Sequence, residues 1–258
     1  MTKTGLILLT LLALMASPML FASGAQDEPV QAEPTAVEPA AAEPAYLTFE
    51  GSHADNWKLE ATDGLLIGGY GDNFVYDGKA VVPVAGKAMV DVNAKTNQGT
   101  MTAEFNGTIT PEAGKSYTGD IRLEYTKFAE GSDFWEGGLA DYVYLHGDTG
   151  QEAPVMPKVR TFLGSWGPVD IYVNDELVYE NLAGHMMYTE GSRDRSTYAL
   201  YNSDKSGFFS PMDPSNSSIA APDKTELHFV AHTTDPDSGN FPPHTVWLHL
   251  NFQNVTEL

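Results

Sequence analysis

The chain has 258 residues, a formal net charge of −21 at pH 7 and no cysteine. Without a thiol it cannot form a catalytic cysteine, a thiolate zinc site or a blue-copper centre, because each of these requires Cys. The negative field repels nucleic acid and anionic lipid, so neither is expected as a partner, whereas a metal ion or a small ligand is compatible with it. The same acidity also serves simply to keep an exported protein soluble.

The first 45 residues have the composition of a targeting segment followed by a linker. Lys3 precedes an apolar run over residues 5–15, and the small residues 23–25 fit a signal-peptidase site. We therefore expect a signal peptide over residues 1–25, with an uncleaved anchor as the alternative. Residues 26–45 repeat a Glu-Pro unit among alanines, which is typical of a disordered tether. No later stretch is apolar enough to cross a bilayer, so the mature chain is predicted to be periplasmic or extracellular, without a membrane span.

Residues 46–258 have the pattern of one all-β domain. The turn pairs Asp77-Gly78, Asn106-Gly107 and Asn174-Asp175 each separate two alternating runs, and each predicts a two-residue hairpin. Further strands are expected at 57–61, 64–69, 87–92, 120–128, 141–145, 158–163, 226–234 and 245–252. Many short strands in one domain predict a single β-sandwich of two packed, mainly antiparallel sheets, or a barrel-like pair of sheets.

Two segments, 128–150 and 200–218, are rich in Gly, Ser and Asp and predict long irregular loops. Long loops of a β domain usually carry its function, although the second segment equally fits a surface insertion with no role. The "FLGSWG" stretch is not a serine-nucleophile elbow, because Leu163 occupies the position of a required glycine. No glycine pattern that cradles phosphate is present, so a nucleotide-dependent enzyme is not expected.

Strand geometry limits which histidines can act together. His228 and His232 fall on one face of their strand but about 13 Å apart, at about 3.3 Å per residue, which is too far for one ion. If the next strand pairs with this one so that the apolar faces coincide, His249 shares the face of His228. Directly opposed histidines could share an ion, but two imidazoles hydrogen-bonded to their neighbours are the simpler interpretation.

Four other histidines lie at junctions between strands and loops. His232 and His244 flank one connection, while His146 and His185 each adjoin a glycine. In "GHMM", alternation sends Met186 and Met187 to opposite faces, so only Met187 can act beside His185. Imidazole with thioether favours copper, particularly Cu(I), with zinc as the alternative metal. The predicted metal ligands are therefore His146, His185, His232, His244 and Met187, provided that they converge in the fold.

Three functions are compatible with these patterns. The first is an exported, non-catalytic protein that binds copper or another transition metal through loop histidines. The second is a metal-dependent hydrolase or lyase, in which Glu190 or Asp141 would act as general base on metal-bound water. The third is a carbohydrate- or surface-binding module whose contacts come from aromatic side chains. The aromatic candidates for the third function are the twelve tyrosines and the four tryptophans Trp57, Trp135, Trp166 and Trp247.

Overall fold

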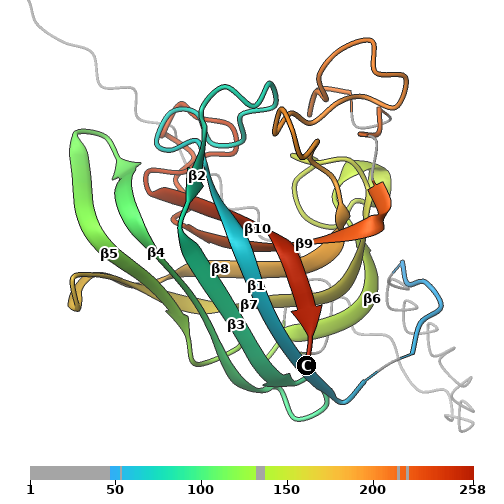
Figure 1. Cartoon of the computed structure of the whole chain (residues 1–258), viewed down its shortest axis with the longest axis horizontal. Helices are drawn as coiled ribbons and strands as arrows, with labels where there is room; N and C mark the ends of the chain where they lie inside the picture. The colour runs from blue at the N-terminus through green and yellow to red at the C-terminus, as the bar shows by residue number, and fades with distance from the viewer. Residues whose placement is uncertain (1–46, 53, 132–136, 214–215, 219–220) are drawn as a thin grey trace, which may run out of the picture. The chain divides into compact units, whose positions relative to one another are not determined.

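The computed structural model describes residues 47–52, 54–131, 137–213, 216–218 and 221–258, which are almost entirely β (Figure 1). The signal peptide expected at 1–25 and the tether expected at 26–45 lie outside these residues. The strands are β1 (Asn56–Ile67), β2 (Val81–Val84), β3 (Gly86–Asn93), β4 (Gln98–Glu112), β5 (Lys115–Tyr125), β6 (Leu139–Leu145), β7 (Val159–Val173), β8 (Glu176–Gly191), β9 (Ala221–His232) and β10 (Trp247–Glu257). Within the described ranges the only helical element is a 3₁₀ turn, Gly147–Thr149, and no helix is long and apolar enough to cross a membrane.

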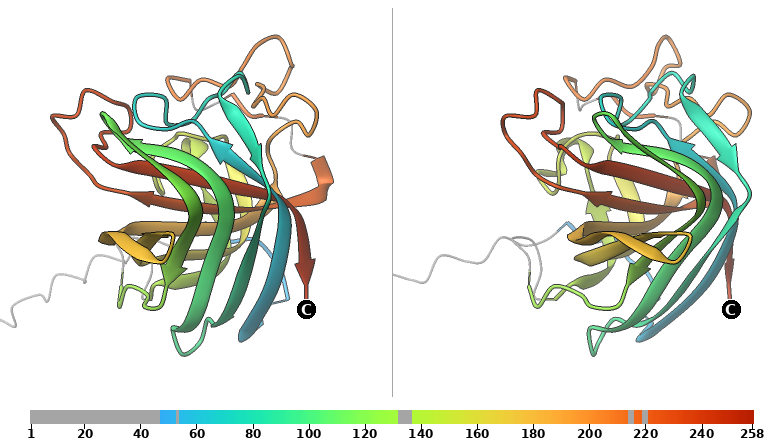
Figure 2. Two further views of the ribbon diagram at one scale, coloured as in Figure 1. Left: turned by 60° about the vertical axis from the view of Figure 1, so that its left-hand side comes forward. Right: turned by 90° about the vertical axis from the view of Figure 1, so that its left-hand side faces the viewer.

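The ten strands belong to one antiparallel sheet that closes on itself. Along the sheet the order is β10-β9-β8-β7-β5-β4-β3-β1, and β1 also pairs with β10, which completes a ring (Figure 2). β2 pairs with Gly64–Ile67 of β1, beyond the segment of β1 that pairs with β3. Along β7, β6 pairs with residues 159–165 and β5 pairs with residues 170–173. The expected all-β antiparallel class is therefore correct, whereas two separate packed sheets are not seen in the described residues.

The sheet has fewer and longer strands than the sequence pattern indicated. The strands expected at 57–61 and 64–69 form one strand, β1, which passes through Asp63 in a left-handed conformation (φ 59°). Likewise, 158–163 and 169–173 are both parts of β7, whose register against β8 shifts at irregularities. Such bulges bend a strand without ending it, so long strands can curve around and close the sheet.

Only one of the three predicted two-residue hairpins is present. Asn174 and Asp175 both have positive φ and connect β7 to β8, as expected. Asn106-Gly107 lies inside β4, where the Asn106 amide donates to the Asp120 carboxylate at 2.7 Å and Gly107 pairs with Gly119 on β5. Asp77-Gly78 is a turn within the irregular β1–β2 connection and not a hairpin, because the run before it, residues 73–76, forms no strand.

The interior of the closed sheet is filled by the apolar residues that alternate along each strand. On β9 these are Leu227, Phe229 and Ala231. All the remaining strands of the ring contribute residues to the same buried cluster. Tyr125 enters this core fully buried, and its hydroxyl donates to the Val230 carbonyl at 2.7 Å. Gly184 of β8 leaves the space for the ring, since a Cβ there would lie 2.4 Å from Tyr125 Cε1.

The second half of β8, residues 226–231 of β9 and the first seven residues of β10 are buried on both faces. Their outward side chains include Met187, Val230 and Trp247, which form a second apolar cluster with residues of the β1–β2 and β6–β7 connections. These connections and the β9–β10 connection therefore cover the outer face of the three strands. Polar residues around this outer face are also buried, among them the predicted histidines His146, His185 and His244, whereas His232 is partly exposed.

Candidate functional site

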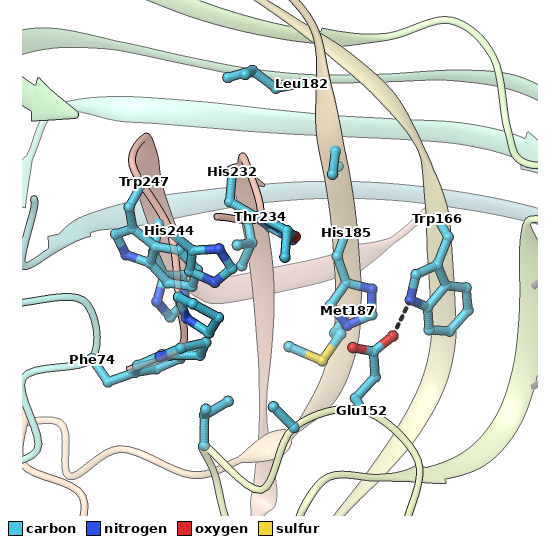
Figure 3. A pocket seen from close by; sticks show the side chains of 18 of the residues that line it. Phe74, Glu152, Trp166, Leu182, His185, Met187, His232, Thr234, His244 and Trp247 are labelled. Carbon is cyan, nitrogen blue, oxygen red and sulfur yellow. Dashed lines mark hydrogen bonds between the residues drawn. The ribbon is translucent and has the colours of Figure 1, made fainter. Parts of the chain in front are cut away.

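A cavity of about 660 Å³ lies between the outer face of β8–β10 and the three connections that cover it (Figure 3). All five predicted ligands line this cavity: His146, His185, Met187, His232 and His244. They come from the end of β6, from β8, from the end of β9 and from the β9–β10 connection. A volume in this range is typical of a site for a small molecule or cofactor.

Strand alternation separates the two methionines as the sequence predicted. Met186 is fully buried in the interior cluster, whereas Met187 belongs to the outer cluster and borders the cavity. His185 stacks on Trp166 of β7 with ring centroids 4.7 Å apart and an interplanar angle of 29°. The rings of His146 and His185 meet edge to face at a centroid distance of 6.2 Å. One side of the cavity thus carries the imidazoles of His146 and His185 and the thioether of Met187, the last two of which are labelled in Figure 3.

The opposite side carries the other two predicted histidines. The rings of His232 and His244 have centroids 4.3 Å apart, and His244 also stacks on Trp247 at 4.9 Å and 19°. Trp247 is itself held in place, because its indole N–H donates to the Asn73 carbonyl at 2.9 Å. Phe74, next in the chain, packs against the same indole at 4.9 Å.

Burial keeps the four imidazoles neutral. It lowers the pKa of His185 and of His244 to about 4, and it lowers the pKa of His146 and of His232 below the ordinary value. Because burial removes the imidazolium from water and so disfavours it, each ring is neutral and carries a single N–H at pH 7.

In each of these rings the N–H is on Nδ1, where it donates to a backbone carbonyl. His146 Nδ1 donates to Ala153 O at 2.8 Å and His185 Nδ1 to Ser165 O at 2.9 Å. The Thr233 carbonyl accepts from the Nδ1 atoms of both His232 and His244. A neutral imidazole with a proton on Nδ1 has a lone pair on Nε2, so all four Nε2 atoms are acceptors or ligands. A backbone carbonyl on the other ring nitrogen is also the usual support of a metal-binding histidine.

No family model, curated protein or solved structure matches this chain. The chemistry of the cavity must therefore carry the functional argument.

One contact in the cavity is unfavourable as it stands. His146 Nε2 lies 3.2 Å from Met187 Sδ. The nitrogen presents a lone pair because its partner Nδ1 holds the proton, and a thioether sulfur is likewise an acceptor without a hydrogen. A proton on Nε2 would relieve the contact only by charging a buried ring, which burial disfavours. A cation bound between the two atoms relieves it without that cost.

Glu152 was not identified from the sequence, but it lines the cavity beside His185. Its carboxylate accepts the indole N–H of Trp166 at 2.7 Å. Burial opposes ionisation, but the positive charges that His185 and His146 acquire in acid, together with the indole N–H, outweigh it and hold the pKa of Glu152 below its ordinary value. Its position in the irregular β6–β7 connection gave no periodic signal from which its direction could be read.

The shared face of His228 and His249 is as expected, but the two residues are offset by two residues along the strands. His249 pairs with Val230, and Asn251 pairs with His228. The two rings still touch, with His228 Nδ1 3.1 Å from His249 Nε2. Both are buried, and only His249 also lines the cavity.

Of the residues proposed for the other two functions, Trp166 and Trp247 line the cavity, whereas the two proposed general bases lie outside it. Glu190 accepts from the Arg160 backbone N–H at 3.2 Å, and neither it nor Asp141 lines the cavity. Trp57 is buried in the interior core and Trp247 in the outer cluster, so neither offers a surface platform. Trp135 lies outside the described residues.

Proposed function

We propose that the protein is an exported, non-catalytic metal-binding protein that holds a transition metal ion, preferentially Cu(I), in the histidine-lined cavity. The observation that carries the proposal is the set of four neutral imidazoles whose Nδ1–H groups are all tied to backbone carbonyls. Their Nε2 lone pairs are then available to a metal, and Met187 Sδ lies against one of them.

The ligand types favour a soft ion of low coordination number. In the described part of the chain, no three His, Asp or Glu side chains lie close enough together to hold one ion, which argues against a ready tetrahedral zinc site. Two imidazoles and a thioether, from His146, His185 and Met187, are a set that suits Cu(I). Nitrogen ligands bond at about 2.0–2.1 Å, so two imidazoles on one ion have ring centroids no more than about 6.5 Å apart. The His146–His185 separation of 6.2 Å meets this limit.

The His232–His244 pair offers an alternative position for the single ion. Its centroid distance of 4.3 Å also meets the limit, and it lies across the cavity from Met187 (Figure 3). Without a thioether this pair has less preference for Cu(I) over Zn²⁺. We assign the Cu(I) preference to the Met187 side.

We further propose that residues 1–25 are a signal peptide and residues 26–45 a tether, so that the folded part works in the periplasm or outside the cell. The support is the composition of these segments. N-terminal sequencing of the mature protein tests the proposal, because cleavage after Ala25 exposes Gln26 as the first residue. An intact N-terminus in the membrane fraction would instead identify an anchor.

Competition against a chromophoric Cu(I) chelator tests the metal proposal. The wild-type protein is expected to take up one equivalent of Cu(I), and Met187→Leu is expected to lower the affinity by about tenfold, or about 1.4 kcal/mol. Met186→Leu is the matched control, because it makes the same change one residue away in the interior core. A Leu in place of Met conserves volume, so both variants should fold.

Three results would count against the proposal. They are the absence of stoichiometric metal, equal effects of the two methionine variants, and glycan binding that persists when the cavity histidines are replaced by Ala. Binding of an exogenous anion to the bound metal would instead favour the metal-dependent enzyme.

A further inference from the structure

One oxygen of the Glu152 carboxylate is available to a bound molecule. Its Oε1 accepts the Trp166 indole N–H at 2.7 Å, whereas no hydrogen bond from the described residues reaches Oε2. The unpartnered atoms His185 Nε2 and His249 Nδ1 are closed to solvent, but Glu152 Oε2 is not among such atoms. Because Glu152 lines the cavity, Oε2 is a carboxylate oxygen that a guest can reach.

The β6–β7 connection holds Glu152 in place before any guest arrives. Glu152 has a left-handed backbone conformation (φ 60°), which a residue other than glycine rarely adopts. The preceding residue is tied down, because the Gln151 carbonyl accepts the His146 backbone N–H at 3.0 Å. Such conformations persist only where the surroundings enforce them, and they cluster at ligand sites. A carboxylate that is already positioned lowers the entropy cost of binding.

Two imidazoles of the cavity offer further acceptors. Burial lowers the pKa of both His232 and His244, so the rings are neutral, and each donates its single N–H from Nδ1 to the Thr233 carbonyl. Their Nε2 atoms therefore carry lone pairs, and neither atom is among the unpartnered ones that are closed to solvent. Glu152 Oε2 and these two nitrogens all require hydrogen-bond donors from a guest.

The charge around the cavity favours a cationic guest. Among the described residues that line it there is no Lys or Arg, so no fixed cation neutralises Glu152 from within the cavity. The chain as a whole carries a formal net charge of −21, which attracts cations and repels anions at long range. An alkylammonium group has a positive charge, three N–H donors and no acceptor, so it supplies what these polar atoms lack.

The wall across from Glu152 is aromatic and apolar. It contains Trp247, on which His244 stacks at 4.9 Å, and Phe74, which packs against the same indole at 4.9 Å (Figure 3). The cavity volume of about 660 Å³ far exceeds the space that one ion needs and lies within the range of organic ligand sites. The cavity therefore suits a cation that is attached to an apolar body.

We propose that the cavity binds a primary organic amine, whose ammonium group pairs with Glu152 and whose apolar ring lies against Phe74 and Trp247. A hydrogen bond between an ammonium and a carboxylate is about twice as strong as one between neutral groups, which gives the site its preference for amines. Glu152 is not among the proposed metal ligands. Amine binding is therefore a function beyond metal uptake and does not require it.

Three probes that share one ring but differ in charge test the proposal. Tryptamine, tryptophol and indole-3-propionate carry an ammonium, a hydroxyl and a carboxylate, respectively, on the side chain of the same indole. In calorimetric titrations of the full chain at pH 7 with EDTA present, tryptamine is expected to bind at least about tenfold more tightly than tryptophol. Indole-3-propionate is expected not to bind. Because EDTA removes metal, failure of the Cu(I) proposal would leave these results unchanged, and the reverse also holds.

Glu152→Gln should abolish the preference for the amine. The amide oxygen can still accept the Trp166 N–H, so the new NH₂ group takes the place of Oε2 and presents donors to the guest. Tryptamine and tryptophol should then bind about equally. Asp148→Asn is the matched control, because it removes one charge from the same connection at an exposed position outside the cavity, where Asp148 pairs with Lys158 at 3.1 Å. This variant should keep the wild-type ratio.

A crystal structure of the wild-type protein with tryptamine decides the proposal even if Glu152→Gln fails to fold. The amine nitrogen should lie within hydrogen-bond distance of Glu152 Oε2. Equal wild-type affinities for tryptamine and tryptophol, no binding of tryptamine, or binding of indole-3-propionate as tight as that of tryptamine would overturn the proposal. An unchanged ratio in Glu152→Gln, an equal loss in Asp148→Asn, or an amine nitrogen away from Glu152 would do the same.

Discussion

Acidification from pH 7 to pH 5 should destabilise the protein through its buried histidines, and His185 allows the effect to be calculated. In the unfolded chain this imidazole takes up a proton as the pH falls through about 6.5, whereas burial lowers its folded pKa to about 4. Between these values the unfolded state binds more protons, so stability falls as the pH falls. The difference between the unfolded and folded pKa values of His185 corresponds to about 3 kcal/mol of unfolding free energy. About 2 kcal/mol of this stability is lost between pH 7 and pH 5.

The other groups with shifted pKa values either titrate below pH 5 or add to the loss of stability between pH 7 and pH 5. Glu226 and Asp194 have folded pKa values of about 2, so their contributions are present above the unfolded values and are lost only as the pH falls below about 4.5. His146, His244 and His249 are lowered in the same direction as His185. The wild-type loss between pH 7 and pH 5 is therefore expected to exceed about 2 kcal/mol.

Urea denaturation followed by tryptophan fluorescence, at pH 7 and pH 5 with EDTA present, measures this loss. His185→Gln removes the titrating group, so the variant should lose about 2 kcal/mol less than the wild type over the same interval. The comparison uses the change with pH within each protein, which separates it from the constant cost of the substitution. Equal losses in the two proteins would refute the assignment of a neutral, buried His185.

Three stability predictions test the fold around the site. Gly184→Ala should cost about 1–3 kcal/mol, because the new Cβ meets Tyr125 Cε1 at 2.4 Å and the Gly167 carbonyl at 2.7 Å; thermal melts that show no loss would contradict the packing. Tyr125→Phe removes the donor to Val230 O and should cost about 1–2 kcal/mol in urea, with an unchanged m-value. Asn174→Ala should cost about 1 kcal/mol, since Asn174 has φ 50° and accepts from the Asp120 N–H; a neutral result would refute the turn geometry.

The sequence was most informative where alternation decides direction. The opposite placement of Met186 and Met187, and the shared face of His228 and His249, both follow from the two-residue period of a strand. The junction histidines line one cavity as hypothesised, because they end neighbouring strands or lie in the connections between them. Whether they bind metal is a prediction that remains to be tested.

Strand alternation could predict neither the closure of the sheet nor the position of Glu152. The β1–β10 pairing joins strands nearly 200 residues apart, and no local pattern specifies it. Asn106-Gly107 has the letters of a turn, but its neighbours Asp120 and Gly119 on β5 allow the ladder to continue. Both outcomes depend on partners distant in sequence, and tertiary pairing of this kind overrides local preference.

The base of the β9–β10 connection is fixed independently of its tip. The Thr233 and Thr245 hydroxyls meet at 2.7 Å, and the Asp235 N–H donates to the Pro243 carbonyl at 2.8 Å. Beyond this clamp, Gly239 has open space around it and a positive φ of 75°. Exposed tips above a fixed base are the positions that best accept inserted sequence. A fluorescent domain spliced at Gly239 would stand a few residues from His244 without displacing it, so the connection offers a natural point at which to build an optical sensor of whatever occupies the cavity.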